Sequence, residues 1–190
     1  EVDPSWPMLP NDWVLGAVAS VDVDSHDHVW IYHRPRSVDE SQQANAAPAV
    51  LEFDHEGNFV QAWGGPGDGY EWPANEHGIE VDNQGFVWLG GNSGDPESDD
   101  MLLKFTSKGE FVMQIGGRGQ SNGNTDTNNL NRPAESAVYQ NTNEVFVADG
   151  YGNRRVIVFD ADTGEFKRMW GAFENEPLEA SEDQPPPDEL

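Results

Sequence analysis

The chain has 190 residues, 36% of them hydrophobic and 11% aromatic, which is enough for one folded domain with a sizeable β-type core. Its formal net charge of −25 excludes nucleic acid and anionic membrane surfaces as partners, because phosphates attract Lys and Arg rather than Asp and Glu. The absence of cysteine excludes a disulfide framework and a thiolate site.

The start of the chain bears on where the protein works. It begins with Glu1 rather than Met, and the sequence contains no signal-like or membrane-spanning apolar run. We therefore expect that a leader has been removed or that the first residues are missing. The expected location is extracellular or periplasmic, without membrane insertion.

Residues 1–12 are interpreted as an N-terminal extension, and a first repeat unit follows over about residues 13–64. Inside this unit, strands are predicted at Val29 to Ile31, Leu51 to Asp54 and Phe59 to Trp63. Apolar and polar residues alternate there, and Gly, Asn and Asp bound each run.

The same strands return in two further units, at about residues 65–117 and 118–171. Val29, Val87 and Val145 open equivalent strands and are 58 residues apart. The remaining predicted strands of these units lie at Leu103 to Thr106, Phe111 to Ile115, Val158 to Asp160 and Phe166 to Trp170. With one further inner strand, each unit has about four strands.

A self-similar period of this size with four short strands per unit predicts an all-β fold of the β-propeller type, with three four-stranded blades. Propellers close with roughly four to eight blades, so three blades should not close. We expect further blades from the missing chain end or from another subunit. Residues 172–190 are acidic and rich in proline, and are interpreted as a tail or as an excursion between blades.

Four segments resemble one family of propellers. Val145 to Phe159 contains Asp149-Gly-Tyr-Gly-Asn and is followed by Met169-Trp-Gly171, a pattern similar to NHL repeats. Val29 to Arg34 and Glu76 to Ile79 resemble, more particularly, motifs of the N-terminal half of the lyase domain of peptidylglycine α-amidating enzymes. The resemblance implies an NHL-type propeller in which this chain supplies three blades of a six-bladed ring.

The resemblance also implies a function and a site. It implies a secreted, zinc-dependent lyase that cleaves the N–C bond of an α-hydroxyglycine-type amide, with a small or peptide-like substrate. His77 would bind zinc, Arg34 would hold the substrate carboxylate, and Tyr151 would take the hydroxyl proton. The backbone carbonyls of Val21 and Ile79 would hold a calcium ion.

His77 lies where the other units have Ala19 and, allowing one extra residue in a turn, Ala134. An imidazole at an otherwise small position facing the axis fits a metal ligand. A hydrogen-bonded histidine in the channel fits equally well, so both interpretations stay open.

The other positions have structural interpretations too. The glycines of Asp149 to Asn153 permit a tight turn, and its Asp and Asn can bond the backbone locally. Arg34 could form a surface salt bridge, and the carbonyls of Val21 and Ile79 could take part in ordinary strand pairing. In every case a structural role is a full alternative to the catalytic or metal-binding one.

A second class of function also remains open, a non-catalytic extracellular propeller that binds protein or glycan or forms part of an assembly. A calcium-dependent, lactonase-like hydrolase is a third. His26 and His28 belong to the turn at Asp24 to Asp27 and show no spacing that recurs as a metal motif, so they are predicted to be solvated. Among the tryptophans, Trp72 beside Tyr70 is the one expected to be exposed near a pocket.

Overall fold

The computed structural model describes residues 3 and 5–178, which form three four-stranded antiparallel sheets, each built from consecutive strands. The strands of the first sheet are β1 (Ala17–Val23), β2 (Val29–Arg34), β3 (Val50–Phe53) and β4 (Phe59–Trp63). Those of the second sheet are β5 (Glu76–Val81), β6 (Phe86–Gly91), β7 (Met101–Thr106) and β8 (Phe111–Gly116). Those of the third sheet are β9 (Glu135–Tyr139), β10 (Glu144–Asp149), β11 (Arg155–Asp160) and β12 (Phe166–Trp170). The predicted all-β fold with four strands per blade is confirmed.

Short 3-10 helices lie in the connections, namely η1 (Pro35–Ser37), η2 (Glu40–Asn45) and η3 (Ala172–Glu174). The helix η3 occupies the start of the segment interpreted as an acidic tail. Residues 179–190 of that segment lie outside the described residues.

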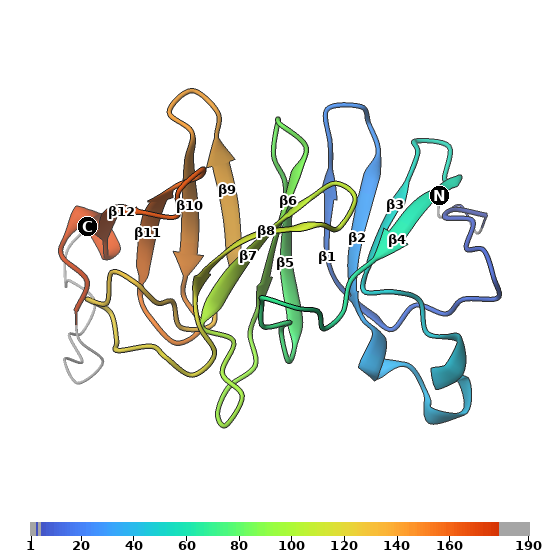
Figure 1. The fold of residues 1–190 in the computed structure, drawn as a ribbon, viewed down its shortest axis with the longest axis horizontal. Coiled ribbons are helices and arrows are strands. Elements are labelled where there is room, and N and C mark those ends of the chain that lie inside the picture. Colours follow the sequence, from blue (N-terminus) through green and yellow to red (C-terminus); the bar gives the residue numbers. More distant parts are fainter. Residues whose placement is uncertain (1–2, 4, 179–190) are drawn as a thin grey trace.

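The three sheets stand side by side, with β4 and β12 at the two far ends (Figure 1). The inner strands β1 and β5 contact each other, and so do β5 and β9. The sheets therefore fan outward from their inner strands, as successive blades of a propeller do.

The turn between the two outer strands of each sheet explains the repeated glycines. Gly57, Gly109 and Gly164 have φ values of +86°, +79° and +72°. Because side chains with a Cβ rarely adopt this left-handed region, glycine is the residue that closes each turn without strain.

Two apolar clusters fill the space between neighbouring sheets. The cluster between the first and second sheets is formed by buried side chains including Trp30, Tyr32, Ile79, Leu89 and Phe105. The cluster between the second and third includes Trp88, Leu102, Val145, Ile157 and Phe159. Each sheet thus buries a face only because a neighbouring sheet covers it.

The prediction that Trp72 is exposed is wrong. Trp72 is only 7% exposed and belongs to the first of these clusters. Its indole Nε1 donates a hydrogen bond to Oε1 of Glu76 over 3.0 Å. A buried partner for the indole N–H allows the whole ring to leave solvent.

Carboxylates on the inner strands join each sheet to the next. Asp22 Oδ2 accepts a hydrogen bond from the backbone N–H of Val81 over 2.6 Å, and Glu80 Oε1 accepts one from Val138 N–H over 3.1 Å. Burial raises the pKa of Glu80 above its ordinary value. In the third sheet the equivalent residue is Ala137, opposite Phe146, so this series of bonds stops there.

The N-terminal segment covers the face of the first sheet that is turned away from the second. Trp6, Leu9 and Trp13 pack against a buried cluster around Ile31 and Phe53. The residues interpreted as an extension therefore contribute, together with the start of the first unit, to the core.

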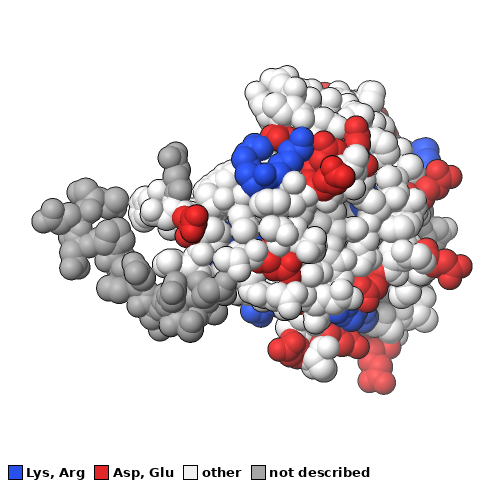
Figure 2. Space-filling model, turned by 60° about the vertical axis from the view of Figure 1, so that its left-hand side comes forward, with Lys and Arg blue, Asp and Glu red and all other residues white. Residues whose placement is uncertain are grey.

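Acidic side chains are spread over the face shown in Figure 2, with fewer Lys and Arg groups between them. This distribution agrees with the net charge of −25. Among the described residues, the structure contains no helix that has both the length and the apolar character needed to cross a membrane.

Candidate functional site

The three residues predicted to be catalytic or to bind zinc lie at one end of the blades. Arg34 ends β2, His77 lies at the start of β5, and Tyr151 lies in the turn after β10. Hydrogen bonds across blades connect this end: Arg34 Nε donates to the Glu76 carbonyl over 2.8 Å, and the Tyr151 hydroxyl lies 2.9 Å from His77 Nε2. Three separate segments of the sequence thus converge on one place.

The hydrogen bonds of His77 indicate its tautomer. Nδ1 lies 2.9 Å from the carbonyl oxygen of Ala134, which can only accept, so Nδ1 carries a proton. In this tautomer the lone pair lies on Nε2, which accepts a hydrogen bond from the Tyr151 hydroxyl over 2.9 Å. The two rings meet edge to face, with centroids 5.1 Å apart. The imidazole is held on both sides, and its Nε2 is covered by a tyrosine that is 51% exposed.

Arg34 is half-buried at the end of β2, and its Nε is held by the backbone carbonyl of Glu76. Within the described part of the chain, no carboxylate lies within salt-bridge distance of its guanidinium. The two terminal amines are thus the groups that can receive an anion, in the planar geometry that suits a carboxylate.

The neighbouring Glu76 is almost fully buried and supports this end of the blades. Arg36 Nη2 lies 3.3 Å from both carboxylate oxygens and also donates to the carbonyl of Pro73 over 3.0 Å. The carboxylate therefore connects Arg36, in the segment directly after Arg34, to the start of β5, where His77 lies.

A buried ion pair between the residues that flank the Tyr151 turn holds this turn in place. Asp149 and Arg155 are joined by a 2.9 Å bond from Nε to Oδ2, and both side chains are 0% exposed. Asp149 also accepts from the side-chain amide of Asn153 and from the backbone N–H of Asn131, each over 2.8 Å. The structural role considered for this turn is real, and it positions Tyr151.

The strand pairing shows where the predicted calcium-binding carbonyls point. Asp24 N–H donates to the carbonyl of His28, and Asp82 N–H donates to the carbonyl of Phe86. The ladders β1–β2 and β5–β6 therefore begin with equivalent hydrogen-bonded pairs. Since hydrogen-bonded pairs alternate along an antiparallel ladder, Val21 and Ile79 fall at positions whose carbonyls face the free inner edge. Calcium binding there stays a prediction.

His33, next to Arg34, is fully buried and neutral. Its Nδ1 accepts from the backbone N–H of Gly16 over 3.0 Å, and its Nε2–H donates to the carbonyl of Pro48 over 2.9 Å. Burial lowers the pKa of His33 below its ordinary value.

We expect this histidine to make the protein less stable in acid. Because the folded pKa is depressed, the unfolded chain takes up the proton first as the pH falls below about 6.5, which favours unfolding. The glutamine of His33→Gln offers a donor and an acceptor but does not titrate. The free energy of unfolding of this variant should therefore fall less between pH 7 and pH 5 than that of the wild-type protein. Thermal melting of both proteins across this range measures the difference, and parallel curves would contradict the expectation.

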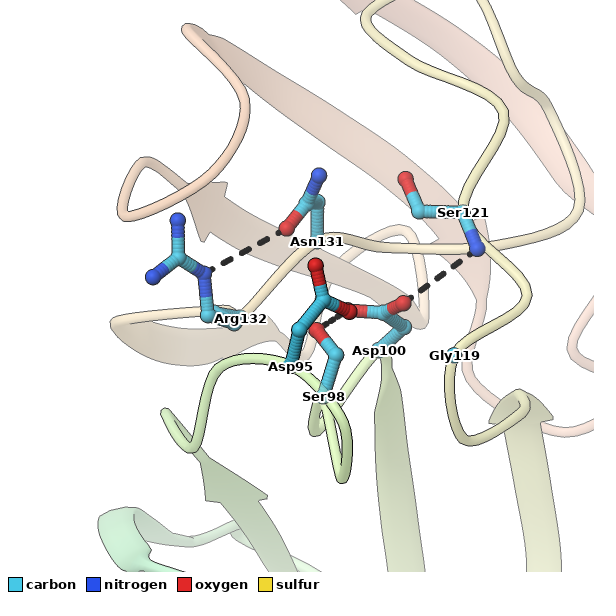
Figure 3. Close-up of a pocket in the computed structure, with 7 residues that line it drawn as sticks. All are labelled: Asp95, Ser98, Asp100, Gly119, Ser121, Asn131 and Arg132. Carbon is cyan, nitrogen blue, oxygen red and sulfur yellow. Dashed lines mark hydrogen bonds between the residues drawn. The ribbon is translucent and has the colours of Figure 1, made fainter.

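A polar cavity of about 280 Å³ opens near the site, lined by Asp95, Ser98, Asp100, Gly119, Ser121, Asn131 and Arg132. Figure 3 shows Asp100 receiving bonds from the Ser98 hydroxyl and from Ser121 N–H, and Arg132 pointing to Asn131. Arg132 also donates to the carbonyl of Tyr151 over 3.0 Å. The cavity and the Tyr151 turn therefore share one arginine.

Sequence reasoning missed Arg132 and the Ala134 carbonyl. Arg132 adopts a left-handed conformation with φ of +57°, which no local pattern of the sequence signals. Ala134 acts through its backbone, so its identity gives no sign of its role. The only usable signal was the alignment of Ala134 with His77 in the repeat.

Comparisons with known proteins agree with the resemblance. NHL repeat-containing protein 3 of Mus musculus is 27% identical over 179 residues, which cover 92% of this chain and 46% of that protein. Peptidylglycine alpha-amidating monooxygenase of Rattus norvegicus is 27% identical over 187 residues, covering 90% and 18%. Peptidyl-alpha-hydroxyglycine alpha-amidating lyase 1 of Drosophila melanogaster is 27% identical over 188 residues, covering 88% and 31%.

The chain thus spans less than half the length of these curated relatives. No family model matches it. Among solved structures, AztD of Citrobacter koseri superposes with a TM-score of 0.47 at 14% identity, over 94% of this chain and 40% of that one. The similarity in sequence to NHL-repeat and amidating proteins extends over most of the chain, as the motifs predicted.

Proposed function

We propose that this chain supplies half of an extracellular or periplasmic, zinc-dependent lyase of the amidating type, which cleaves an α-hydroxyglycine-type amide at the propeller axis. The observation that carries the proposal is the pairing of His77 with Tyr151 at 2.9 Å, beside Arg34. Similarity to the amidating lyase of Drosophila melanogaster supports the same chemistry.

The donor set is compatible with zinc. The Ala134 carbonyl holds the Nδ1–H of His77, an arrangement that orients many metal-binding imidazoles and leaves Nε2 as the ligand atom. Zinc binding requires the Tyr151 hydroxyl to give up its bond to that nitrogen. Because catalytic zinc has three protein ligands, further blades would supply the other two.

The side chains of this chain account for most of the reaction. Arg34 would pair with the substrate carboxylate through its terminal amines. Tyr151, after losing its own proton, would take the proton of the substrate hydroxyl while the N–C bond breaks. The electron pair of that bond goes to the amide nitrogen, which would receive the proton that Tyr151 took from the hydroxyl, and the carbinol becomes the aldehyde of glyoxylate. Bound zinc would polarise the carbinol oxygen.

A structural calcium ion would lie further along the axis. The carbonyls of Val21 and Ile79 face the free inner edge of their strands, and calcium prefers such oxygen ligands. Asp22 and Glu80, which follow them in the chain, would add negative charge near the ion.

Further blades would cover the face of the third sheet that carries Phe146. Trp30 and Trp88 are buried between sheets, and Phe146 holds the equivalent place opposite Ala137. Phe146 is only half-buried, and the guanidinium of Arg168 lies 5.4 Å from its ring centre. A face built like the two covered ones implies a fourth blade, from the rest of the chain or from another subunit.

The runner-up is a non-catalytic propeller that binds protein or glycan. Its support is the match to NHL repeat-containing protein 3, which covers 92% of this chain. If this chain is such a non-catalytic propeller, the hydrogen bond between His77 and Tyr151 only stabilises this end of the blades.

One experiment distinguishes the two functions. It compares the protein from its natural source with the 190-residue chain. Native mass spectrometry gives the assembled mass and the zinc content, and an enzymatic assay follows glyoxylate release from a peptidyl-α-hydroxyglycine. We expect glyoxylate release by the closed ring, and loss of one zinc and of activity in His77→Ala. His55→Ala, at an exposed histidine in a turn, is the control that should keep both. If the zinc-loaded ring releases no glyoxylate, the lyase proposal is wrong and the non-catalytic binding propeller is the function that remains.

A further inference from the structure

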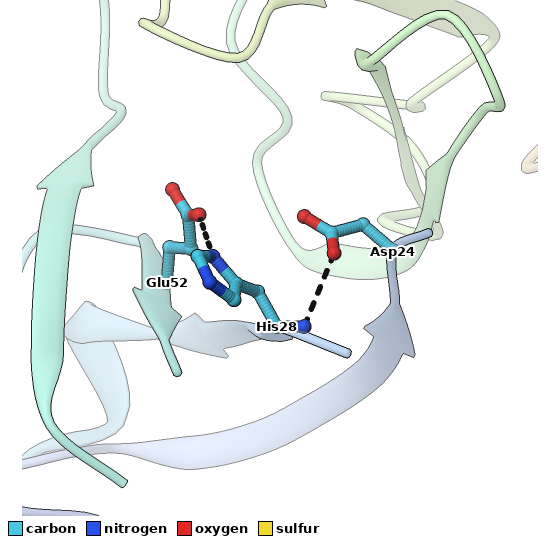
Figure 4. Close-up of side chains that lie close together, drawn as sticks. All are labelled: Asp24, His28 and Glu52. Carbon is cyan, nitrogen blue, oxygen red and sulfur yellow. Dashed lines mark hydrogen bonds and ion pairs between the residues drawn. The ribbon is translucent and has the colours of Figure 1, made fainter. Parts of the chain in front are cut away.

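A second group of metal-ligating side chains lies at the opposite end of β2 from Arg34. Asp24 belongs to the turn between β1 and β2, His28 directly precedes β2, and Glu52 lies on β3. One ligand atom from each of the three lies within 4.8 Å of the others. Figure 4 shows the imidazole of His28 paired with the Glu52 carboxylate, and the Asp24 carboxylate accepting a hydrogen bond from the backbone N–H of His28. Neither the axial site nor the polar cavity uses these residues.

The group is largely shielded from water. The side chains of Asp24 and Glu52 are 12% and 8% exposed, and that of His28 is 30% exposed. His28 Nδ1 lies 2.6 Å from Glu52 Oε1. The expectation that His28 is a solvated turn residue is therefore wrong. Carboxylates and an imidazole at this separation are ligands that divalent transition metals accept.

The other repeats show which part of the group the fold needs. Asp24 Oδ2 accepts from the indole of Trp30 over 3.0 Å, and Asp82 does the same for Trp88 in the second sheet. This bond is a property of the repeat, and it holds the Asp24 carboxylate in place.

His28 and Glu52, in contrast, are not required by the repeat. The second sheet has Phe86 and Lys104 at these positions, with the ammonium group 4.0 Å from the ring centre. The second sheet is folded without a histidine and a glutamate here. The first sheet thus carries a paired imidazole and carboxylate beyond what the blade needs.

Neighbouring residues complete and orient the group. Gln61 Nε2 donates to Glu52 Oε2 and also reaches the Ser107 carbonyl over 2.8 Å, which fixes the carboxylate and leaves Oε1 toward His28. His26 Nδ1 lies 3.9 Å from Asp24 Oδ1, and its side chain is 79% exposed. A rotation of His26 would add a second imidazole.

We propose that Asp24, His28 and Glu52, with His26 as the adaptable fourth ligand, form a binding site for Zn²⁺ or a similar divalent transition metal at the rim of the first blade. Two nitrogen and two oxygen ligands suit the tetrahedral geometry of zinc. The ion would replace the proton between His28 and Glu52, and would fasten the turn before β2 to β3. This proposal does not depend on the proposed lyase.

The test uses the 190-residue chain without an affinity tag, with His77→Ala introduced so that the axial histidine makes no contribution. Isothermal titration with ZnCl₂ in excess CaCl₂ is expected to show one Zn²⁺ per chain. Co²⁺ should give the visible absorption of a tetrahedral site. Zn²⁺ should also raise the melting temperature, since it binds the folded state.

Three variants and one control locate the site. His28→Phe copies the second sheet, and Glu52→Gln preserves the shape of the side chain. Each should weaken Zn²⁺ binding by at least about tenfold and abolish the Co²⁺ spectrum. His26→Ala should weaken binding less, and His55→Ala should change nothing. Circular dichroism confirms that each variant is folded. Absence of Zn²⁺ binding, or affinity within about twofold of the parent in both His28→Phe and Glu52→Gln, would overturn the proposal and leave an ion pair.

Discussion

Replacing Arg155 with methionine is expected to lower the free energy of unfolding by about 3 to 5 kcal/mol, the cost of breaking a buried ion pair by removing one partner. Arg155 is 4% exposed and pairs with Asp149 at 2.9 Å. Its guanidinium also donates to the carbonyls of Asn124 and Asn129, over 2.9 and 2.6 Å. Methionine fills a similar volume but leaves these carbonyls without the guanidinium donor. It also leaves the Asp149 carboxylate without its cationic partner, so that Asn153 and the backbone N–H of Asn131 are the donors that remain to it.

Equilibrium unfolding in urea measures the loss. Arg155→Lys should recover only part of it, because an ammonium group cannot reach the same acceptors in one plane. Arg154→Met is the matched control, since Arg154 is the neighbouring arginine and is exposed. Its expected cost is about 1 kcal/mol or less. If Arg155→Met and Arg154→Met lower the free energy of unfolding by similar amounts, the buried ion pair contributes no more to stability than an exposed arginine does.

The same pair links stability to the site. Asp149 and Arg155 bracket the turn that presents Tyr151, and Arg155 also holds the loop that leads to Asn131. A protein that folds with Arg155→Met should therefore have a poorly positioned Tyr151. Loss of function in that variant would be indirect.

The fold was predictable because its signals are local and occur three times. The strand at Phe59 to Trp63 has the predicted bounds, and the glycine turns have the positive φ that glycine permits. Equivalent strand ends lie at the same rim of a propeller. This explains why Arg34, His77 and Tyr151, predicted from motifs far apart in the sequence, lie together.

What the sequence could not show depends on contacts between distant segments. The carbonyl that fixes His77 belongs to Ala134, whose side chain carries no information. The burial of Trp72 depends on a carboxylate that accepts a hydrogen bond from its indole N–H. The pairing of His28 with Glu52 joins the residue before β2 to a residue of β3. Each of these requires the register and the spacing of the sheets, which composition and motif spacing do not supply.

Tyr151→Phe is expected to lower kcat for glyoxylate release by about 10² to 10⁴, the usual contribution of a positioned acid or base. The substitution removes one hydroxyl and with it the 2.9 Å bond to His77 Nε2, while the ring and its edge-to-face contact remain. Because Arg34 still holds the substrate carboxylate, KM should change little. Steady-state kinetics on the protein from its natural source gives both parameters.

Tyr139→Phe is the matched control, because Tyr139 and Tyr151 are both 51% exposed and each makes one side-chain hydrogen bond through its hydroxyl. The control should keep kcat within about twofold and should melt at the wild-type temperature. Retained activity in Tyr151→Phe would remove the tyrosine from the reaction, and the bond to His77 would then be a structural one. A loss of kcat with unchanged zinc content and unchanged melting temperature would instead assign the hydroxyl to proton transfer. If the bond to His77 were purely structural, its loss would change the zinc content or the melting temperature as well as kcat.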